Sequence, residues 1–286
     1  EINSSRDKPN VNSAAVKKTG WEILVNYRKQ LTKDFSIDAT LNLSTLKNEV
    51  LSLGDNVQPI TSGAMSSSFS DSPSITKPGE AIGSFYGYKI NGFDADGNLI
   101  FADTDTSGSV DANDKVILAN PIPDFSYGLN LTMSYKDFDL TMFFQGVQGN
   151  EIFNQKKNTY YFDYSNNCVT DVLNAWTKNN LNTNIPIMKT QNTDGGNSLP
   201  SEFYIEDGSY FRCKNLQLGY NFPKSILNKI SFNKLRVYAG VQNLFTITNY
   251  SGYDPEVSSN ALFSRGIDSA SYPNARTFTF GFNASF

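Results

Sequence analysis

The chain has 286 residues, a net charge of −4 and no histidine. With 24 basic against 28 acidic residues, it carries no positive field that would attract nucleic acid. The absence of histidine removes the commonest general base and a usual ligand of zinc and iron. No run of about 18 apolar residues occurs, so the sequence predicts no transmembrane helix.

The chain opens with a polar stretch, residues 1–10, that has none of the features of a signal peptide. A secreted or outer-membrane protein needs such a peptide, so we expect that residue 1 is not the natural start. The two cysteines, Cys168 and Cys213, fit no recognised disulfide framework. A pair between them in an oxidising compartment and two free thiols are both compatible with the sequence.

Seven segments alternate between apolar and polar residues with the period of two that marks an extended strand. In the last of them Phe278, Phe280 and Phe282 share one face with Phe286, the final residue. The polar faces carry mainly Asn, Gln, Asp, Thr and Ser, and few long charged side chains. In chain order the segments are residues 21–28, 35–44, 125–135, 138–145, 215–222, 235–242 and 277–286.

This alternation fits either a soluble sheet with one buried face or a transmembrane barrel whose apolar face meets lipid. The segments approach the about 9–11 residues that a tilted strand needs to cross a bilayer, whereas soluble strands average about 5–6. Several apolar faces begin or end in an aromatic residue, as girdles at the membrane interfaces require. These residues are Trp21, Tyr27, Phe125, Tyr135 and Phe286.

Short and long connections alternate along the chain without exception. Outer-membrane barrels have short periplasmic turns and long extracellular loops, and placing Phe286 at the periplasmic end satisfies this rule throughout. Three loops of such length are uncommon in a compact sandwich, so the sequence favours the barrel. The short connections are 30–35, 135–138 and 222–233, and the long ones are 46–124, 147–209 and 245–274.

The predicted fold class is therefore all-β: an antiparallel transmembrane β-barrel with long extracellular loops. Seven strands cannot form a large barrel, and single-chain barrels usually have an even number of strands. We therefore expect residues 1–286 to be the C-terminal part of a longer barrel, whose remaining strands lie upstream.

Residues 103–114 resemble a calcium-binding loop within one of the extracellular connections. Gly108 stands at the sixth position, where such a loop turns sharply, and the ligand positions carry hard oxygen donors. The flanking residues are not helical in pattern, so this is a calcium-type loop outside an EF-hand, and a solvated acidic turn is the alternative. The predicted calcium ligands, for a structural ion, are Asp103, Asp105, Ser107, Ser109 through its backbone carbonyl, Asp111 and Asp114.

The remaining loop segments give weaker signals. Residues 54–80 are rich in Ser, Gly and Pro and are expected to be mobile. The aromatic residues of 83–93, like Trp176, could contact a glycan or partner, but packing onto the barrel mouth is the favoured reading. No catalytic constellation is present, so the sequence does not predict an enzyme.

Several collinear segments together resemble the C-terminal half of SusC/RagA-type TonB-dependent outer-membrane transporters. The resemblance covers nearly the whole chain and is carried by KTGWEILVNYR (18–28), GSFYGYKINGF (83–93), residues 103–154, NAWTKNNLNTNIP (174–186), DGSYFRCKNLQLGYNFP (207–223) and LRVYAGVQNLFTITNYSGYDPEV (235–257).

The resemblance implies a barrel of about 22 strands with a plugged lumen, in the bacterial cell outer membrane. It implies the import of oligosaccharides or peptides together with a SusD-like surface lipoprotein, and contact with TonB through an upstream part absent from this sequence. Two alternative functions remain compatible with the sequence: a passive porin, and a secreted calcium-stabilised β-sandwich that binds glycans. The resemblance transfers no catalytic residue and no substrate contact.

Overall fold

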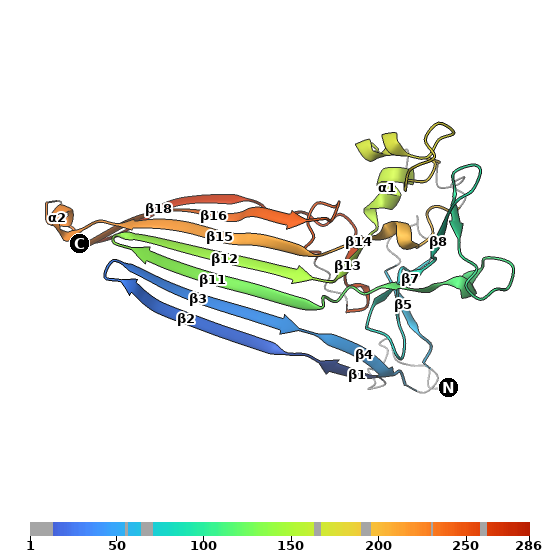
Figure 1. Cartoon of the computed structure of the whole chain (residues 1–286), viewed down its shortest axis with the longest axis horizontal. Helices are drawn as coiled ribbons and strands as arrows, with labels where there is room; N and C mark the ends of the chain where they lie inside the picture. The colour runs from blue at the N-terminus through green and yellow to red at the C-terminus, as the bar shows by residue number, and fades with distance from the viewer. Residues whose placement is uncertain are drawn as a thin grey trace, which may run out of the picture.

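The computed structural model describes residues 14–54, 57–63, 71–162, 167–189, 196–229, 231–257 and 262–286. A long antiparallel sheet forms one half of the molecule, and the long connections gather into a folded loop assembly at one end of it (Figure 1). None of the helices in these ranges is long and apolar enough to span a membrane.

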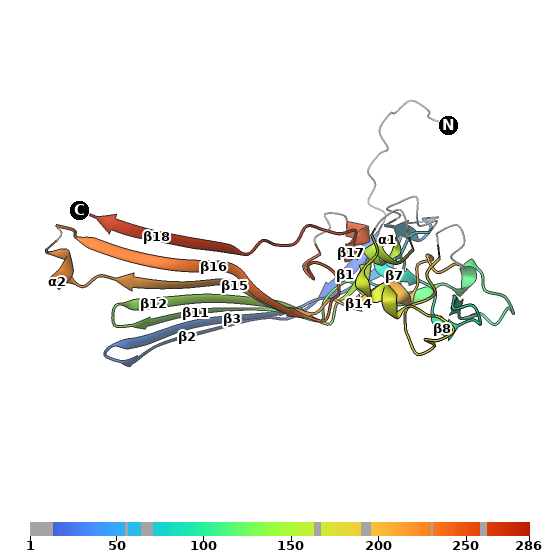
Figure 2. The same ribbon diagram turned by 90° about the horizontal axis from the view of Figure 1, so that it is seen from above.

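All seven predicted strands are confirmed, and they form one seven-stranded sheet in the order β18-β16-β15-β12-β11-β3-β2. Figure 2 shows that the strands spread out in depth, so the sheet is curved. The strands are β2 Glu22–Thr32, β3 Phe35–Thr45, β11 Phe125–Tyr135, β12 Phe138–Gln148, β15 Tyr210–Asn221, β16 Lys234–Thr248 and β18 Thr277–Ser285.

Four strands, β2, β12, β15 and β16, extend further than the alternation predicts, and in β15 and β16 a bulge accounts for this. The register between β15 and its neighbours shifts at a bulge between Cys213 and Asn215, opposite Phe143 and Phe144 of β12. The extra residue in the bulge shifts the alternation of apolar and polar residues by one position. The first residues of β15 therefore do not continue the pattern of residues 215–222. In β16 the corresponding irregularity contains Asn243, whose φ is 52°.

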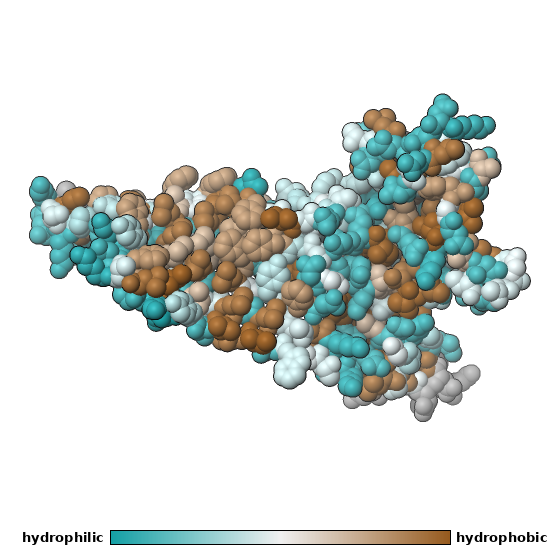
Figure 3. Space-filling model, in the orientation of Figure 1, coloured by the Kyte–Doolittle hydropathy of each residue, from teal (hydrophilic) through white to brown (hydrophobic). Residues whose placement is uncertain are grey.

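The register places most apolar residues of the seven strands on one face, with Leu24 and Phe143 among the exceptions. Leu129 of β11, for example, lies opposite Leu41 of β3 and Phe144 of β12. This face is uncovered: Phe280 and Phe282 are 79% and 71% exposed. Brown, hydrophobic side chains gather over these strands in Figure 3. A soluble β-sandwich would bury such a face against a second sheet, so the fold supports the barrel prediction.

The two ends of the sheet differ as the connection lengths predict. The turns after β2 and β11 and the connection from β15 to β16, which holds α2 (Lys224–Leu227), lie at one end, together with the C-terminus (Figure 1). There the ring of Phe286 lies 4.6 Å from that of Phe232. The three long connections all leave the opposite end (Figure 1).

The long connections fold into small sheets and short helices. β1 (Ala15–Thr19) pairs with β4 (Lys47–Ser52), and β8 (Ile90–Phe93) pairs with β9 (Leu99–Phe101). A second sheet has the order β10-β7-β6-β5 and a third the order β14-β13-β17. Their strands are β5 Ile60–Ser62, β6 Ser74–Thr76, β7 Ser84–Gly87, β10 Val116–Ala119, β13 Glu151–Asn154, β14 Ile205–Asp207 and β17 Ile267–Asp268. The helical segments are η1 Ala112–Asp114, α1 Lys156–Phe162, η2 Thr170–Asn174, η4 Glu202–Tyr204 and η5 Leu262–Ser264.

One hydrophobic core joins all three long connections. Phe85 comes from the first connection, Phe153 and Tyr204 from the second, and Ile267 from the third. The rings of Phe153 and Tyr204 stack with centroids 5.2 Å apart. Because these residues are buried together, the loops form a single unit at the end of the sheet (Figure 1).

The structure differs from one loop prediction and agrees with another. Parts of residues 54–80 pair as β5 and β6, and Ser74 donates a hydrogen bond to the carbonyl of Phe263, so these parts do not match a mobile loop. Residues 55–56 and 64–70 lie outside the described ranges. The packing role of the aromatic residues is confirmed for Phe85, Tyr88 and Trp176, which are all buried. Both cysteines are free, with Cys168 exposed and Cys213 buried.

Candidate functional site

The polar face of the seven-stranded sheet is the first candidate site. Successive side chains alternate between faces, so this face points to the barrel interior when the apolar face meets lipid. Asn130 of β11 lies opposite Thr40 of β3, whose hydroxyl donates a 2.8 Å hydrogen bond to the amide oxygen of Asn26. The centre of the wall is therefore a neutral hydrogen-bonding surface.

The few long charged side chains that the sequence predicts on this face form ion pairs across strands. Arg28 forms an ion pair with Asp38, and Arg236 of β16 reaches across β15 to pair with Asp139 of β12. The arginine nitrogen Nε lies 3.0 Å from Asp139 Oδ1. Gly219 makes this crossing possible, because a Cβ there would lie 2.4 Å from the guanidinium. Alternation reveals the face of a residue but not its cross-strand partner, so these pairs could not be predicted.

A buried ion network lies where the wall meets the loop assembly. Arg212 of β15 is 2% exposed and binds Asp254, Glu256 at 2.8 Å and the hydroxyl of Thr246 at 2.8 Å. Lys214 in the bulge also binds Glu256, at 2.7 Å. Burial opposes ionisation of Asp254, but Arg212 and the backbone amides of Asn274 and Glu256 outweigh it, so the pKa of this carboxyl lies below its ordinary value. The network ties the last long connection to the wall.

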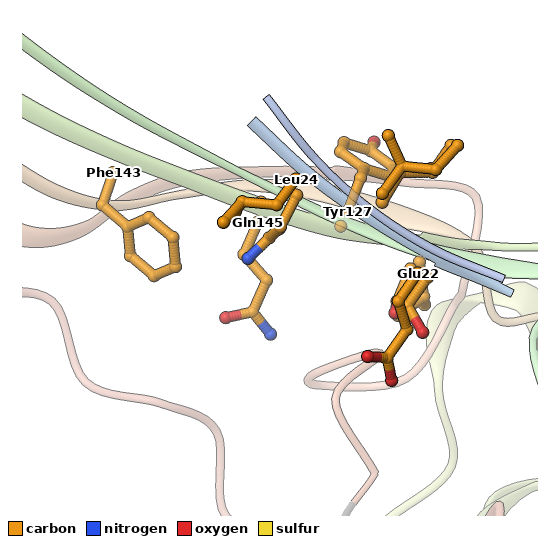
Figure 4. A pocket seen from close by; sticks show the side chains of 13 residues that line it. Glu22, Leu24, Tyr127, Phe143 and Gln145 are labelled. Carbon is orange, nitrogen blue, oxygen red and sulfur yellow. The ribbon is translucent and has the colours of Figure 1, made fainter. Parts of the chain in front are cut away.

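A hollow of about 650 Å³ lies on the same face, close to the loop end of β2, β3, β11 and β12. Figure 4 shows Glu22, Phe143 and Gln145 projecting to one side of the strands and Tyr127 to the other. Leu24 and Phe143 give the hollow an apolar part beside the amide of Gln145. This surface combines an aromatic ring with hydrogen-bonding groups and is open on the polar face of the sheet.

The calcium-type loop is the second candidate site. Carboxylate oxygens of Asp103, Asp105 and Asp114 lie within 4.8 Å of one another, so three of the predicted ligands come together. The Asp103 carboxylate accepts hydrogen bonds from the backbone amides of Ser107 at 3.1 Å and Gly108 at 2.7 Å. Gly108 has φ +91°, the left-handed conformation that favours glycine at this turn.

The other predicted ligands lie beside this cluster in different arrangements. The Ser107 hydroxyl donates to the Ser109 carbonyl at 2.9 Å, so both oxygens share one side of the loop. Asp111 caps η1 by accepting the amide of Asn113 at 2.7 Å, which directs its carboxylate to the helix. Asp114 is fully buried, and the amide of Asp111 holds the pKa of its carboxyl below the ordinary value, with help from Thr104. The donors are all oxygens, which suits calcium.

Together these features define a class of protein. A curved antiparallel sheet with an apolar outer face and a polar inner face, short turns at one end and folded loops at the other, is the wall of an outer-membrane-type β-barrel.

Comparison with known proteins shows which barrel proteins this chain resembles. The chain is 35% identical to TonB-dependent receptor P3 of Formosa agariphila, covering 96% of this chain and 29% of that protein. It is 30% identical to TonB-dependent receptor SusC of Bacteroides thetaiotaomicron, covering 96% of this chain and 27% of that protein. The chain thus spans less than a third of these relatives. No family model matches it.

The fold agrees with the sequence similarity. The structure superposes on the RagAB peptide transporter with a TM-score of 0.76 and 23% identity, covering 96% of this chain and 29% of that chain. The closed-closed state of the RagAB peptide importer gives a TM-score of 0.75. These findings confirm the resemblance to SusC/RagA-type TonB-dependent outer-membrane transporters and the predicted fold class.

Proposed function

We propose that the protein containing this chain imports a polar oligomer across the bacterial outer membrane, driven by TonB and assisted by a SusD-like surface lipoprotein. The observation that carries this proposal is the two-faced sheet, which has an apolar band for lipid and a neutral hydrogen-bonding wall on the other side. The similarity to SusC and to other TonB-dependent receptors supports the coupling to TonB.

The wall favours a glycan or a peptide over a lipid. Amide and hydroxyl groups such as those of Asn26, Thr40 and Asn130 can exchange hydrogen bonds with a polar chain, and they would leave an acyl chain in contact with polar groups. The inward arginines Arg28 and Arg236 are neutralised by Asp38 and Asp139, so this part of the wall carries little net charge.

Uptake measured in cells tests the proposal. A strain lacking the full-length gene should lose import of its oligosaccharide or peptide, and a strain lacking TonB should lose it equally. Import that persists without TonB would instead identify a passive porin. Binding of the purified receptor to a SusD-like lipoprotein from the same organism, measured by co-purification, tests the partner. Uptake of an iron chelate alone would contradict the proposed cargo.

We further propose that Asp103, Asp105, Ser107, Ser109, Asp111 and Asp114 hold one structural calcium ion. The convergence of three carboxylates within 4.8 Å supports this proposal. Titration of the full-length receptor with calcium should show one site that is lost in Asp103→Ala, whereas the control Asp96→Asn in another exposed turn keeps it. A map in calcium buffer without density at about 2.3–2.6 Å from these oxygens would reject the site.

A further inference from the structure

A groove of about 580 Å³ lies in the loop assembly, between the β8–β9 hairpin, α1 and the segment η4–β14. Its volume falls in the range of small-ligand sites, about 300–1,000 Å³. It is separate from the wall of the sheet and from the calcium-type loop, because none of their residues lines it.

The floor of the groove is apolar and supported from below. Ile90, Leu99, Ile185 and Phe203 contribute to its lining. Phe203 packs edge-on against Tyr204, with ring centroids 5.2 Å apart, and Tyr204 belongs to the core that joins the three long connections. The floor is therefore preformed and presents branched aliphatic and aromatic carbon to an occupant.

The rim carries unbalanced negative charge. Glu206 is neutralised by Lys157, whose Nζ lies 2.9 Å from Glu206 Oε1 and 2.8 Å from the carbonyl of Phe203. Asp171 and Glu202 are exposed and form no ion pair within the described residues. Glu202 accepts only the amide of Ile90 at 2.9 Å, and Asp171 accepts the hydroxyl of Tyr161 at 3.5 Å. Two carboxylates therefore remain for a cation.

We propose that this groove binds a short peptide that carries a cationic group next to an apolar side chain. The inference rests on the proposed import function and selects the peptide class for its cargo. The aliphatic carbon of Ile90, Leu99 and Ile185 accepts a leucine or phenylalanine side chain, and a neutral glycan offers the two rim carboxylates no cation. Asp171 and Glu202 attract the ammonium or guanidinium of such a peptide.

Equilibrium binding to the purified full-length receptor tests the proposal. The probes are the fluorescently labelled tetrapeptides Lys-Leu-Phe-Lys and Glu-Leu-Phe-Glu, followed by anisotropy, with maltotetraose as unlabelled competitor. The variants are Asp171→Asn, Glu202→Gln and their combination. Asp34→Asn, which removes a carboxylate from the short turn at the opposite end of the sheet, is the matched control.

The basic peptide should bind best, and its affinity should fall by about threefold to tenfold for each carboxylate removed and decrease as salt screens the rim. The control should bind as the wild type does. Unchanged affinity in the double variant, absence of measurable binding, or equal binding of the acidic peptide or the glycan would overturn the proposal. If peptide uptake depends on TonB but neither substitution changes it, the groove proposal is wrong and the import function stands. If cells with the wild-type receptor show no TonB-dependent uptake at all, the import function itself is wrong.

Discussion

Arg212 shows how a single side chain fixes a long connection to the barrel wall. Its guanidinium is buried between the carboxylates of Asp254 and Glu256, which lie in the last long connection. Removing one partner of a buried ion pair leaves an uncompensated charge, which costs about 3–5 kcal/mol. The sequence could not predict this network, because the partners lie 42 and 44 residues along the chain from Arg212.

We therefore expect Arg212→Met to release the connection from the wall. Limited proteolysis of the full-length receptor should then cut within residues 249–257, which should resist cleavage in the wild type. The double variant Arg212→Met with Asp254→Leu should regain resistance, because it buries no unpaired charge. Equal cleavage of the wild type and the single variant would contradict the role of the network.

Asp114 holds the two ends of the calcium-type loop together through hydrogen bonds to backbone amides. Its carboxylate accepts hydrogen bonds from the backbone amides of Asp111 at 2.7 Å and Thr104 at 2.6 Å. These bonds favour the charged carboxylate and lower the pKa of Asp114. Its contribution to stability is therefore present above the unfolded carboxyl pKa of about 3.9 and is lost as pH falls through the lower folded value.

Acidification should accordingly loosen residues 103–114 before the sheet unfolds. Hydrogen exchange of these amides should accelerate as pH falls below about 4, after correction for the intrinsic rate. Asp114→Asn should show fast exchange already at neutral pH, because the asparagine amide has one oxygen, whereas both carboxylate oxygens of Asp114 accept backbone amides. Exchange in the variant that matches the wild type at neutral pH would show that the carboxylate does not order the loop.

At the scale of the element, alternation was sufficient to locate the strands and insufficient to locate their ends. In β11 and β3 each residue has a regular partner from end to end, so the local pattern predicts the whole strand. In β15 the polar face carries even-numbered residues such as Arg212 before the bulge and odd-numbered residues such as Asn215 and Gln217 after it. A bulge arises from contacts with neighbouring strands, which a single segment does not record.

The two faces of the central strands can be tested directly. Spin labels at Ile37 and Leu129 should be accessible to lipid-soluble oxygen in bilayer-reconstituted receptor, because both positions lie on the apolar face. Labels at Asp38 and Asn130, one residue further along each strand, should be protected from it. The reverse pattern would show that the apolar face is turned inward.

At the scale of the whole molecule, the sheet was predictable and the loop assembly was not. The strands follow from a period of two that each segment carries by itself. The loop core depends on Phe85, Phe153 and Ile267 meeting from three separate connections, so no local pattern encodes it. In the calcium-type loop the carboxylates of Asp103, Asp105 and Asp114 lie together, while Asp111 caps η1, a contact that the spacing of the ligands does not encode.

The seven-stranded sheet has two outer edges. β2 and β18 are its terminal strands, each paired on one side within the described residues. Unpaired backbone groups are not tolerated in the hydrocarbon layer, so both strands need further partners when the sheet is part of a membrane barrel. Amides of β2 and β18 should therefore be protected from hydrogen exchange in the full-length receptor. In the isolated 286-residue chain in detergent they should exchange much faster than those of β11 and β12. Equal protection of the edge and central strands in a monomer of the isolated chain would mean that this sheet needs no other strands to complete it.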